Sequence, residues 1–212
     1  MLIRLDLKPF DQYDDELEAR QQQLSMRVQE IQRLVHLIED IQKGKAVKNV
    51  LEPQFDSQTF SGMFDLSKMI MSGHSFGGAT TIRSLAKISQ FKMGIPLDAW
   101  MVPLRNFSGL SLIDKPLLFI NMEDFQTKRN IRVMRRYLAP NGNNTFNRRS
   151  VTIRDATHFH VNDIPMILTP TAKRILEFYL ADHSMTQSLS IAFMLEFISD
   201  HLKSQTSILE FI

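Results

Sequence analysis

Apolar residues recur in a helical rhythm near the start of the chain. Residues 14–43 contain no proline or glycine, and the spacing of their apolar positions alternates between four and three residues. These positions are Leu24, Val28, Ile31, Val35 and Ile38. The pattern predicts one long amphipathic helix over residues 14–43, which ends before Gly44. Because the apolar stripe is short for a coiled coil, a helix packed against a sheet is favoured.

Beyond this helix, short apolar runs alternate with helical patterns. After a polar connection over residues 45–67, strands are predicted at residues 69–71, 93–97, 116–121 and 150–153, and helices at residues 78–89, 130–138, 170–181 and 186–202. This alternation is typical of an α/β fold with a doubly wound, mostly parallel sheet. Pro96 has no N–H group for a strand ladder, so the second strand is expected to be short or distorted there.

Composition narrows the class of protein. The 212 residues are 43% hydrophobic and 23% charged, which is typical of an ordinary globular domain. The formal net charge is only +2, so nucleic acid is not expected as a partner. The absence of cysteine excludes disulfides, thiolate nucleophiles and cysteine-based metal sites.

Neither a membrane span nor an export signal is predicted. No apolar run approaches the roughly 20 residues that a spanning helix requires. Charged residues break the apolar run at the start of the chain, so it does not resemble a signal peptide. The expected location is the cytoplasm, with secretion as the alternative if sequence is missing upstream of Met1.

A serine lies where a predicted strand gives way to a predicted helix. Gly73-His74-Ser75-Phe76-Gly77 fits the G-x-S-x-G pattern of a nucleophile elbow, and this context disfavours the alternative of an ordinary glycine-rich turn. The nucleophile of such an elbow occupies a tight turn, which requires small neighbours. The helix N-terminus beneath it favours the negative charge that develops on an attacked carbonyl, and the backbone N–H of Phe76 is the natural first oxyanion donor.

A serine nucleophile needs a histidine base. The candidates are His36, His74, His158, His160, His183 and His201. Hydrolases of this fold place the base in a loop after the last strand, a position that His158 and His160 both satisfy. His158 is nearer the predicted strand end and is preferred, with His160 as the alternative.

The acid of the triad is open at this point. Glu123 or Asp124 follows the strand at 116–121, and Asp98 follows the strand at 93–97. Each gives the chain order serine, acid, histidine, so spacing does not choose between them.

A family resemblance bears on that choice. Gly73 to Thr80 and Gly94 to Leu104, which includes Leu-Asp-Ala-Trp, closely resemble the plasma-type and type II intracellular platelet-activating factor acetylhydrolases. Further matches are residues 44–49, 116–121, 125–126 and 152–154 with His158, and the resemblance covers roughly residues 10–200.

The resemblance implies a fold, a triad and a reaction. It implies an α/β-hydrolase with Ser75 as nucleophile, Asp98 as acid and His158 as base, within a catalytic core at residues 68–203. It also implies calcium-independent hydrolysis of the sn-2 acetyl, short or oxidised acyl ester of phospholipids, without cofactor or metal. The expected partner is phospholipid at a membrane or lipoprotein surface.

The chain departs from the family pattern before Ser75. Complete members carry earlier strands and a His-Gly loop that supplies a second oxyanion N–H, whereas the only glycines upstream of Gly73 are Gly44 and Gly62. We therefore expect residues 1–212 to form a single, partial α/β-hydrolase domain that lacks its N-terminal strands. Two alternatives follow. One is a catalytically impaired fragment that binds lipid or pairs with another subunit, a homo-oligomer included, and the other is a generic carboxylesterase.

Overall fold

Four parallel strands form the centre of the molecule. The computed structural model describes residues 17–139, 147–169, 171 and 181–202. The strands lie in the order of the sequence: β1 (Ile70–His74), β2 (Met93–Leu97), β3 (Leu117–Met122) and β4 (Arg148–Ile153). Every neighbouring pair is parallel, as predicted, and the carboxyl ends of the strands therefore meet at one edge of the sheet.

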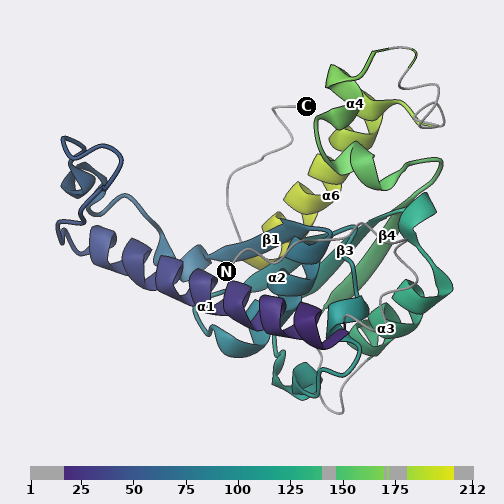
Figure 1. The fold of residues 1–212 in the computed structure, drawn as a ribbon, viewed down its shortest axis with the longest axis horizontal. Coiled ribbons are helices and arrows are strands. Elements are labelled where there is room, and N and C mark those ends of the chain that lie inside the picture. The colour runs from purple at the N-terminus through teal and green to yellow at the C-terminus, as the bar shows by residue number, and fades with distance from the viewer. Residues whose placement is uncertain (1–16, 140–146, 170, 172–180, 203–212) are drawn as a thin grey trace.

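Helices cover both faces of this sheet (Figure 1). One face packs with α1 (Leu17–Gln42), α2 (Phe76–Lys87) and α3 (Lys128–Leu138), and the other with α6 (His183–Leu202). Shorter elements are α4 (Ile164–Ile167) and the 3₁₀ turns η2 (Ser57–Phe60), η3 (Leu66–Lys68), η4 (Val102–Leu104), η5 (Gly109–Leu112), η6 (Glu123–Phe125) and η7 (His158–Val161). None of the helices in the described part of the chain is long and apolar enough to cross a membrane. The helix predicted over residues 170–181 lies almost wholly outside the described residues, which include only 171 and 181 of that range.

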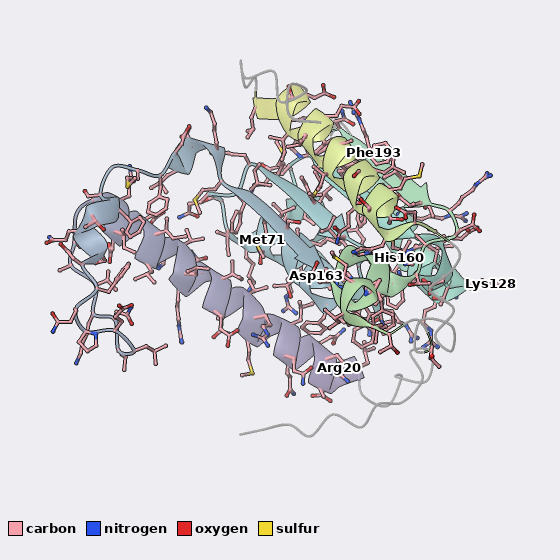
Figure 2. The ribbon with its side chains drawn as sticks, turned by 90° about the horizontal axis from the view of Figure 1, so that it is seen from above. Arg20, Met71, Lys128, His160, Asp163 and Phe193 are labelled. Atoms are coloured by element: carbon pink, nitrogen blue, oxygen red, sulfur yellow. The ribbon has the colours of Figure 1, made fainter. Side chains whose placement is uncertain are left out.

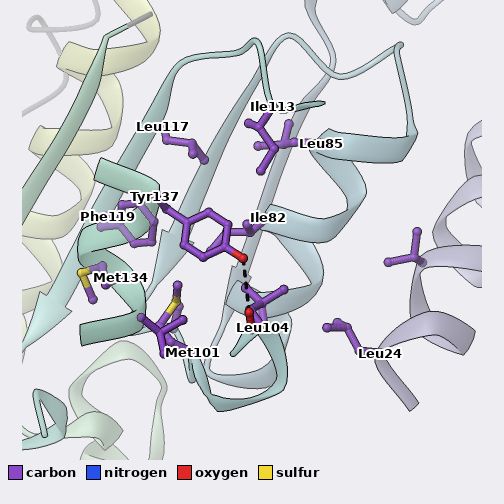
Figure 3. Packing of buried hydrophobic residues seen from close by; sticks show 14 of the residues in the cluster. Leu24, Ile82, Leu85, Met101, Leu104, Ile113, Leu117, Phe119, Met134 and Tyr137 are labelled. Atoms are coloured by element: carbon purple, nitrogen blue, oxygen red, sulfur yellow. Dashed lines mark hydrogen bonds between the residues drawn. The ribbon is translucent and has the colours of Figure 1, made fainter. Parts of the chain in front are cut away.

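The larger apolar cluster lies between the sheet and helices α1, α2 and α3. Figure 3 shows Tyr137 of α3 at its centre, with its hydroxyl donating to the Leu104 carbonyl at 3.4 Å. Burial raises the pKa of Tyr137 to about 12, so the phenol keeps its proton and remains a donor. From the sheet, Leu117 and Phe119 face this cluster, while Leu118 and Ile120 face the cluster beneath α6. This alternation is that of a strand buried on both faces.

Helix α1 packs chiefly on α2 and η4. Its predicted apolar stripe faces the core, because Leu24, Val28 and Val35 are buried and Ile31 packs against them. The prediction of a long helix is confirmed over its described length. Helix α1 does pack toward the sheet, but α2 lies between α1 and the strands.

Pro96 affects one side of β2, as its chemistry predicts. On the β3 side, the N–H groups of Gly94 and Asp98 donate to the carbonyls of Pro116 and Ile120. Pro96 lies between them and has no hydrogen to donate, so the β2–β3 pairing register is interrupted there. On the other side, β2 keeps a continuous five-residue register with β1.

Candidate active site

The predicted elbow joins β1 to α2. β1 continues through Gly73 to His74, beyond the predicted end at residue 71, and α2 begins at Phe76 rather than Gly78. Ser75 alone connects them, with φ 58° and ψ −116°. Its N–H donates to the Leu97 carbonyl at 3.0 Å, and its carbonyl accepts the Trp100 N–H at 2.9 Å. The elbow is therefore tied to the end of β2.

The elbow requires two of its three glycines for steric reasons. A Cβ on Gly73 would lie 2.4 Å from the Gly77 carbonyl oxygen, and a Cβ on Gly78 would lie 2.5 Å from the Ala99 Cβ. Both distances are far inside van der Waals contact. A Cβ on Gly77, in contrast, would meet no described atom within 4 Å.

The Gly78→Ala substitution is therefore expected to destabilise the fold. Its methyl group would force α2 away from Ala99, at a cost of about 2–3 kcal/mol of unfolding free energy, as for an overpacked core. Gly77→Ala is the matched control, because it adds the same methyl group to open space in the same helix. Urea unfolding followed by circular dichroism measures both. Equal unfolding free energies for the two variants would contradict this account.

Asp98 and His158 meet at the carboxyl edge of the sheet. The Asp98 Oδ2 lies 2.5 Å from the His158 Nδ1, and both residues are buried. The other carboxylate oxygen, Oδ1, accepts the Met122 N–H at 2.9 Å and the Gln126 side-chain amide at 3.0 Å. These donors compensate a buried negative charge, and the orientation of the carboxylate is fixed by three groups.

The two other candidate acids contact the histidine loop through its backbone. Asp124 accepts the N–H of His158 at 2.9 Å, and Glu123 accepts the N–H of Asp155 at 2.8 Å. Burial raises the pKa of Asp124. These carboxylates hold the segment that carries His158 through its backbone, a role that the order of residues along the chain does not indicate.

Backbone strain gathers around this edge. Among the residues that the structure describes, the non-glycine residues with positive φ are Ser75, Asp98 and Asp155. Each directly follows a strand or lies close to its carboxyl end. Residues other than glycine rarely adopt positive φ angles, and a cluster of such residues is typical of a functional site.

Two rings enclose the imidazole of His158. The Phe125 ring stacks on it with centroids 3.8 Å apart, and the His74 ring lies at 4.3 Å. Because Ser75 directly follows His74, its hydroxyl and the imidazole belong to the same corner of the sheet. The Ser75 side chain does not cap α2. No sequence signal assigned a role to Phe125, and His74 was only a candidate base.

The alternative base, His160, has a different environment. It is buried, its Nδ1 accepts the Thr157 N–H at 3.0 Å, and its Nε2 lies 3.2 Å from the Ala181 carbonyl. Since Nδ1 accepts, Nε2 carries the hydrogen and donates to Ala181. His160 thus ties the turn at His158 to the segment before α6, and Figure 2 shows it beneath that helix.

The same corner contains a geometry that suits metal ligation. His74, Asp98 and His158 each offer a ligand atom, and these atoms lie within 4.8 Å of one another. A metal ion bound through Asp98 Oδ2 and His158 Nδ1 would replace their hydrogen bond. Metal binding through these two atoms and the hydrogen bond between Asp98 and His158 are therefore mutually exclusive.

His74 is expected to make stability depend on pH. Burial, with a contribution from the nearby His158, lowers the pKa of His74 to about 4 from the usual 6.5. Between these values the unfolded chain binds more protons, so stability from His74 is fully present above pH 6.5 and is lost as the pH falls toward 4. Allowing for its partial exposure, we expect a loss of about 1–2 kcal/mol.

Urea unfolding at pH 8 and pH 5 measures the contribution of His74 to the free energy of unfolding. The His74→Gln variant should lose less stability between the two pH values than the wild type does. His36→Gln, an exposed site on α1, serves as the control. If the His74→Gln variant loses as much stability between pH 8 and pH 5 as the wild type does, the assignment of this pH dependence to His74 is refuted.

Comparison with known proteins gives relatives along nearly the whole chain. The family described as platelet-activating factor acetylhydrolase, isoform II, matches residues 2–209. The platelet-activating factor acetylhydrolase of Canis lupus familiaris is 39% identical over 158 residues, which are 74% of this chain and 34% of the dog protein. That of Bos taurus is 34% identical over 206 residues, 95% of this chain and 44% of the bovine protein. The chain thus spans less than half the length of these relatives.

A solved structure supports the fold class independently. A ferulic acid esterase from Streptomyces cinnamoneus superposes with a TM-score of 0.60 over 90% of this chain and 52% of the esterase chain. At 15% sequence identity this likeness concerns the fold alone, and it agrees with the predicted α/β-hydrolase class.

Proposed function

Because this chain belongs to the platelet-activating factor acetylhydrolase isoform II family, we propose that it is a serine esterase that acts on phospholipids. The proposed reaction is hydrolysis of the sn-2 acetyl or short acyl ester of a glycerophosphocholine. Ser75 is the nucleophile, His158 the base and Asp98 the acid. The observation that carries this proposal is the hydrogen bond between Asp98 and His158 beside a strained serine elbow.

The acid sets the tautomer of the base. A carboxylate accepts hydrogen bonds, so His158 Nδ1 carries the hydrogen and Nε2 presents its lone pair. In the proposed mechanism, Nε2 takes the proton of the Ser75 hydroxyl as the serine oxygen attacks the ester carbonyl carbon. The Asp98 carboxylate then stabilises the imidazolium.

The oxyanion forms above the start of α2. The Phe76 N–H is the first of this helix and has no partner within it, so it is available to the carbonyl oxygen as negative charge develops. Collapse of the tetrahedral intermediate breaks the ester bond. The lyso-phospholipid oxygen receives the proton from His158, and the acyl group remains on Ser75.

Hydrolysis of the acyl-enzyme repeats these steps with water. His158 Nε2 removes a proton from water as the water oxygen attacks the acyl carbon. When the second tetrahedral intermediate collapses, its bond to the Ser75 oxygen breaks, and this oxygen receives the proton from His158. The products are the short carboxylic acid and the free enzyme.

A fluorophosphonate probe tests the nucleophile directly. The wild-type chain should be labelled at Ser75, as located by mass spectrometry, and should hydrolyse a short-chain phosphocholine ester. The Ser75→Ala variant should show neither. Equal labelling of wild type and variant, or labelling at another serine only, would refute the proposal.

The edge of the sheet supports a second candidate function. Within the described residues β1 pairs with β2 alone, and open strand edges favour association with other chains. A chain that binds a subunit or lipid without catalysis is the corresponding proposal. It predicts a concentration-dependent dimer in gel filtration together with no fluorophosphonate labelling, whereas a labelled monomer would exclude it.

A further inference from the structure

One 3₁₀ turn contacts both the candidate acid and the candidate base. Three consecutive side chains of η6 and the residue after it reach this pair. Asp124 accepts the His158 N–H at 2.9 Å, and the Phe125 ring stacks on the His158 imidazole. The Gln126 side-chain amide donates to Asp98 Oδ1 at 3.0 Å. A single short turn therefore sets where the acid and the base lie relative to each other.

The hydrogen bond to Asp98 fixes one atom of the imidazole but not the plane of its ring. The outer torsion of a histidine side chain has broad minima, so a ring held only at Nδ1 can tilt and move Nε2 with it. The Phe125 ring lies 3.8 Å from the imidazole with 24° between the planes, and the His74 ring lies at 4.3 Å with 36°. Two rings this close cannot share one face, so His158 is the middle ring of a stack and cannot tilt freely.

The Phe125 side chain is itself held in place. It is buried and forms a small apolar cluster with Trp100 and Val102. Phe76, which directly follows the candidate nucleophile, packs against the same cluster. The backbone around Phe125 is also fixed, because its carbonyl accepts the Thr127 N–H at 3.0 Å. The ring that stacks on the base is thus anchored to the elbow that carries the nucleophile.

We propose that Phe125 is a positioning residue of the reaction, which holds the His158 imidazole in the plane that directs Nε2 at the Ser75 hydroxyl. This inference rests on the proposed esterase function and assigns how its base is held. The same contact suits both protonation states of the base. A neutral imidazole stacks on the phenyl ring, and the imidazolium that forms during attack is attracted to the face of that ring.

The competing role for Phe125 is a wall that binds substrate. With Trp100 and Val102 it also lines a cavity of about 230 Å³. Loss of a substrate wall weakens binding and raises KM. Loss of a positioning contact leaves KM nearly unchanged and lowers kcat, because the base is misplaced only when it must take the proton. The two roles therefore change different kinetic constants.

The hydrogen bond between His158 and Asp98 supplies a readout that needs neither substrate nor turnover. In proton NMR of the full chain, the Nδ1 proton of this bond should resonate downfield of the amide protons, and its loss in His158→Gln assigns it. In Phe125→Leu we expect this proton to exchange with water about 3- to 10-fold faster, the range that the energy of one aromatic stack allows. Phe125→Tyr keeps the ring and should keep the wild-type exchange rate.

Hydrolysis of a short-chain phosphocholine ester tests the consequence for the reaction. Phe125→Leu should lower kcat about 10- to 100-fold and change KM less than about 2-fold, whereas Phe125→Tyr should restore kcat to within about 3-fold of the wild type. Phe159→Leu is the matched control. Phe159 also neighbours His158, but its ring meets the imidazole edge-on at 6.1 Å and is 42% exposed. Its kcat and the exchange rate of the Nδ1 proton should stay within about 2-fold of the wild-type values.

Three outcomes would overturn the positioning role. They are a raised KM at unchanged kcat in Phe125→Leu, an unchanged exchange rate of the Nδ1 proton in that variant, and an equal loss of kcat in Phe159→Leu. Circular dichroism confirms that each variant is folded, and Phe125→Met, which fills similar space without a flat ring, gives the same test should Phe125→Leu unfold. Fluorophosphonate labelling of Ser75 in the wild type reports the esterase proposal separately. A labelled wild type with an unaffected Phe125→Leu overturns the positioning role alone, and an unlabelled wild type overturns the esterase.

Discussion

Replacing Ser75 with alanine is expected to lower kcat for a short-chain phosphocholine ester by about 10⁴-fold or more. The variant keeps the elbow backbone and the Phe76 N–H but has no oxygen to form the acyl-enzyme, so only uncatalysed attack by bound water remains. Steady-state release of the carboxylic acid measures this loss. A pre-steady-state burst of lyso-phospholipid should appear in the wild type, if deacylation is the slower step, and disappear in the variant.

The matched control for this experiment is Ser89→Ala. Ser89 is an exposed serine just beyond α2, where it lies near the amino ends of the strands and away from the triad. The kcat of the Ser89→Ala variant should stay within about 2-fold of the wild-type value, as for ordinary surface substitutions. A Ser75→Ala variant that retained a tenth of wild-type kcat would remove Ser75 from the mechanism.

The second large effect is expected for Asp98→Asn, a drop in kcat of about 10⁴-fold. The hydrogen bonds of the site explain why. The Met122 N–H and the Gln126 amide both donate to Oδ1, so the asparagine oxygen is held there and its NH₂ group faces His158 Nδ1. Nδ1 must then accept a hydrogen, and the proton moves to Nε2. The base can no longer take the proton of Ser75.

Asp124→Asn is the control for this substitution. Its oxygen can still accept the His158 N–H, so kcat should fall less than about 10-fold. The kcat of both variants is measured over pH 6–9, and circular dichroism confirms that each variant is folded. A larger loss for Asp124→Asn than for Asp98→Asn would reverse the two roles and make Asp124 the acid.

The fold could be predicted largely because its central strands, β2 and β3, are buried on both faces. The strand at Met93 to Leu97 has the predicted bounds, and the alternation of strands and helices was sufficient for the parallel topology. The end of β1 was wrong by three residues, since Ser72 and Gly73 were interpreted as a stop. Gly73 instead belongs to the strand, and it is a glycine because the close approach of α2 leaves no room for a Cβ there.

The acid of the candidate triad was harder to predict from residue spacing. In a parallel sheet Asp98, Glu123 and Asp124 all follow strands at the same edge, so chain order does not distinguish them. Contact with the imidazole depends on side-chain direction, which the positive φ of Asp98 and the anchoring of its Oδ1 determine. The resemblance to known esterases selected Asp98, and the structure places it against His158.

The close contact of α2 with Ala99 also bears on how this site can be redesigned. A Cβ at position 78 would meet Ala99, and a Cβ at position 73 would meet the backbone of residue 77, which no side-chain change can move aside. We therefore expect glycine to be retained at positions 73 and 78 among functional homologues. The Cβ of a larger residue at position 77 itself meets no described atom within 4 Å, although this position is two residues from Ser75. A library directed at acyl-chain selectivity should therefore start from position 77, two residues from Ser75, where a new side chain has room without displacing α2.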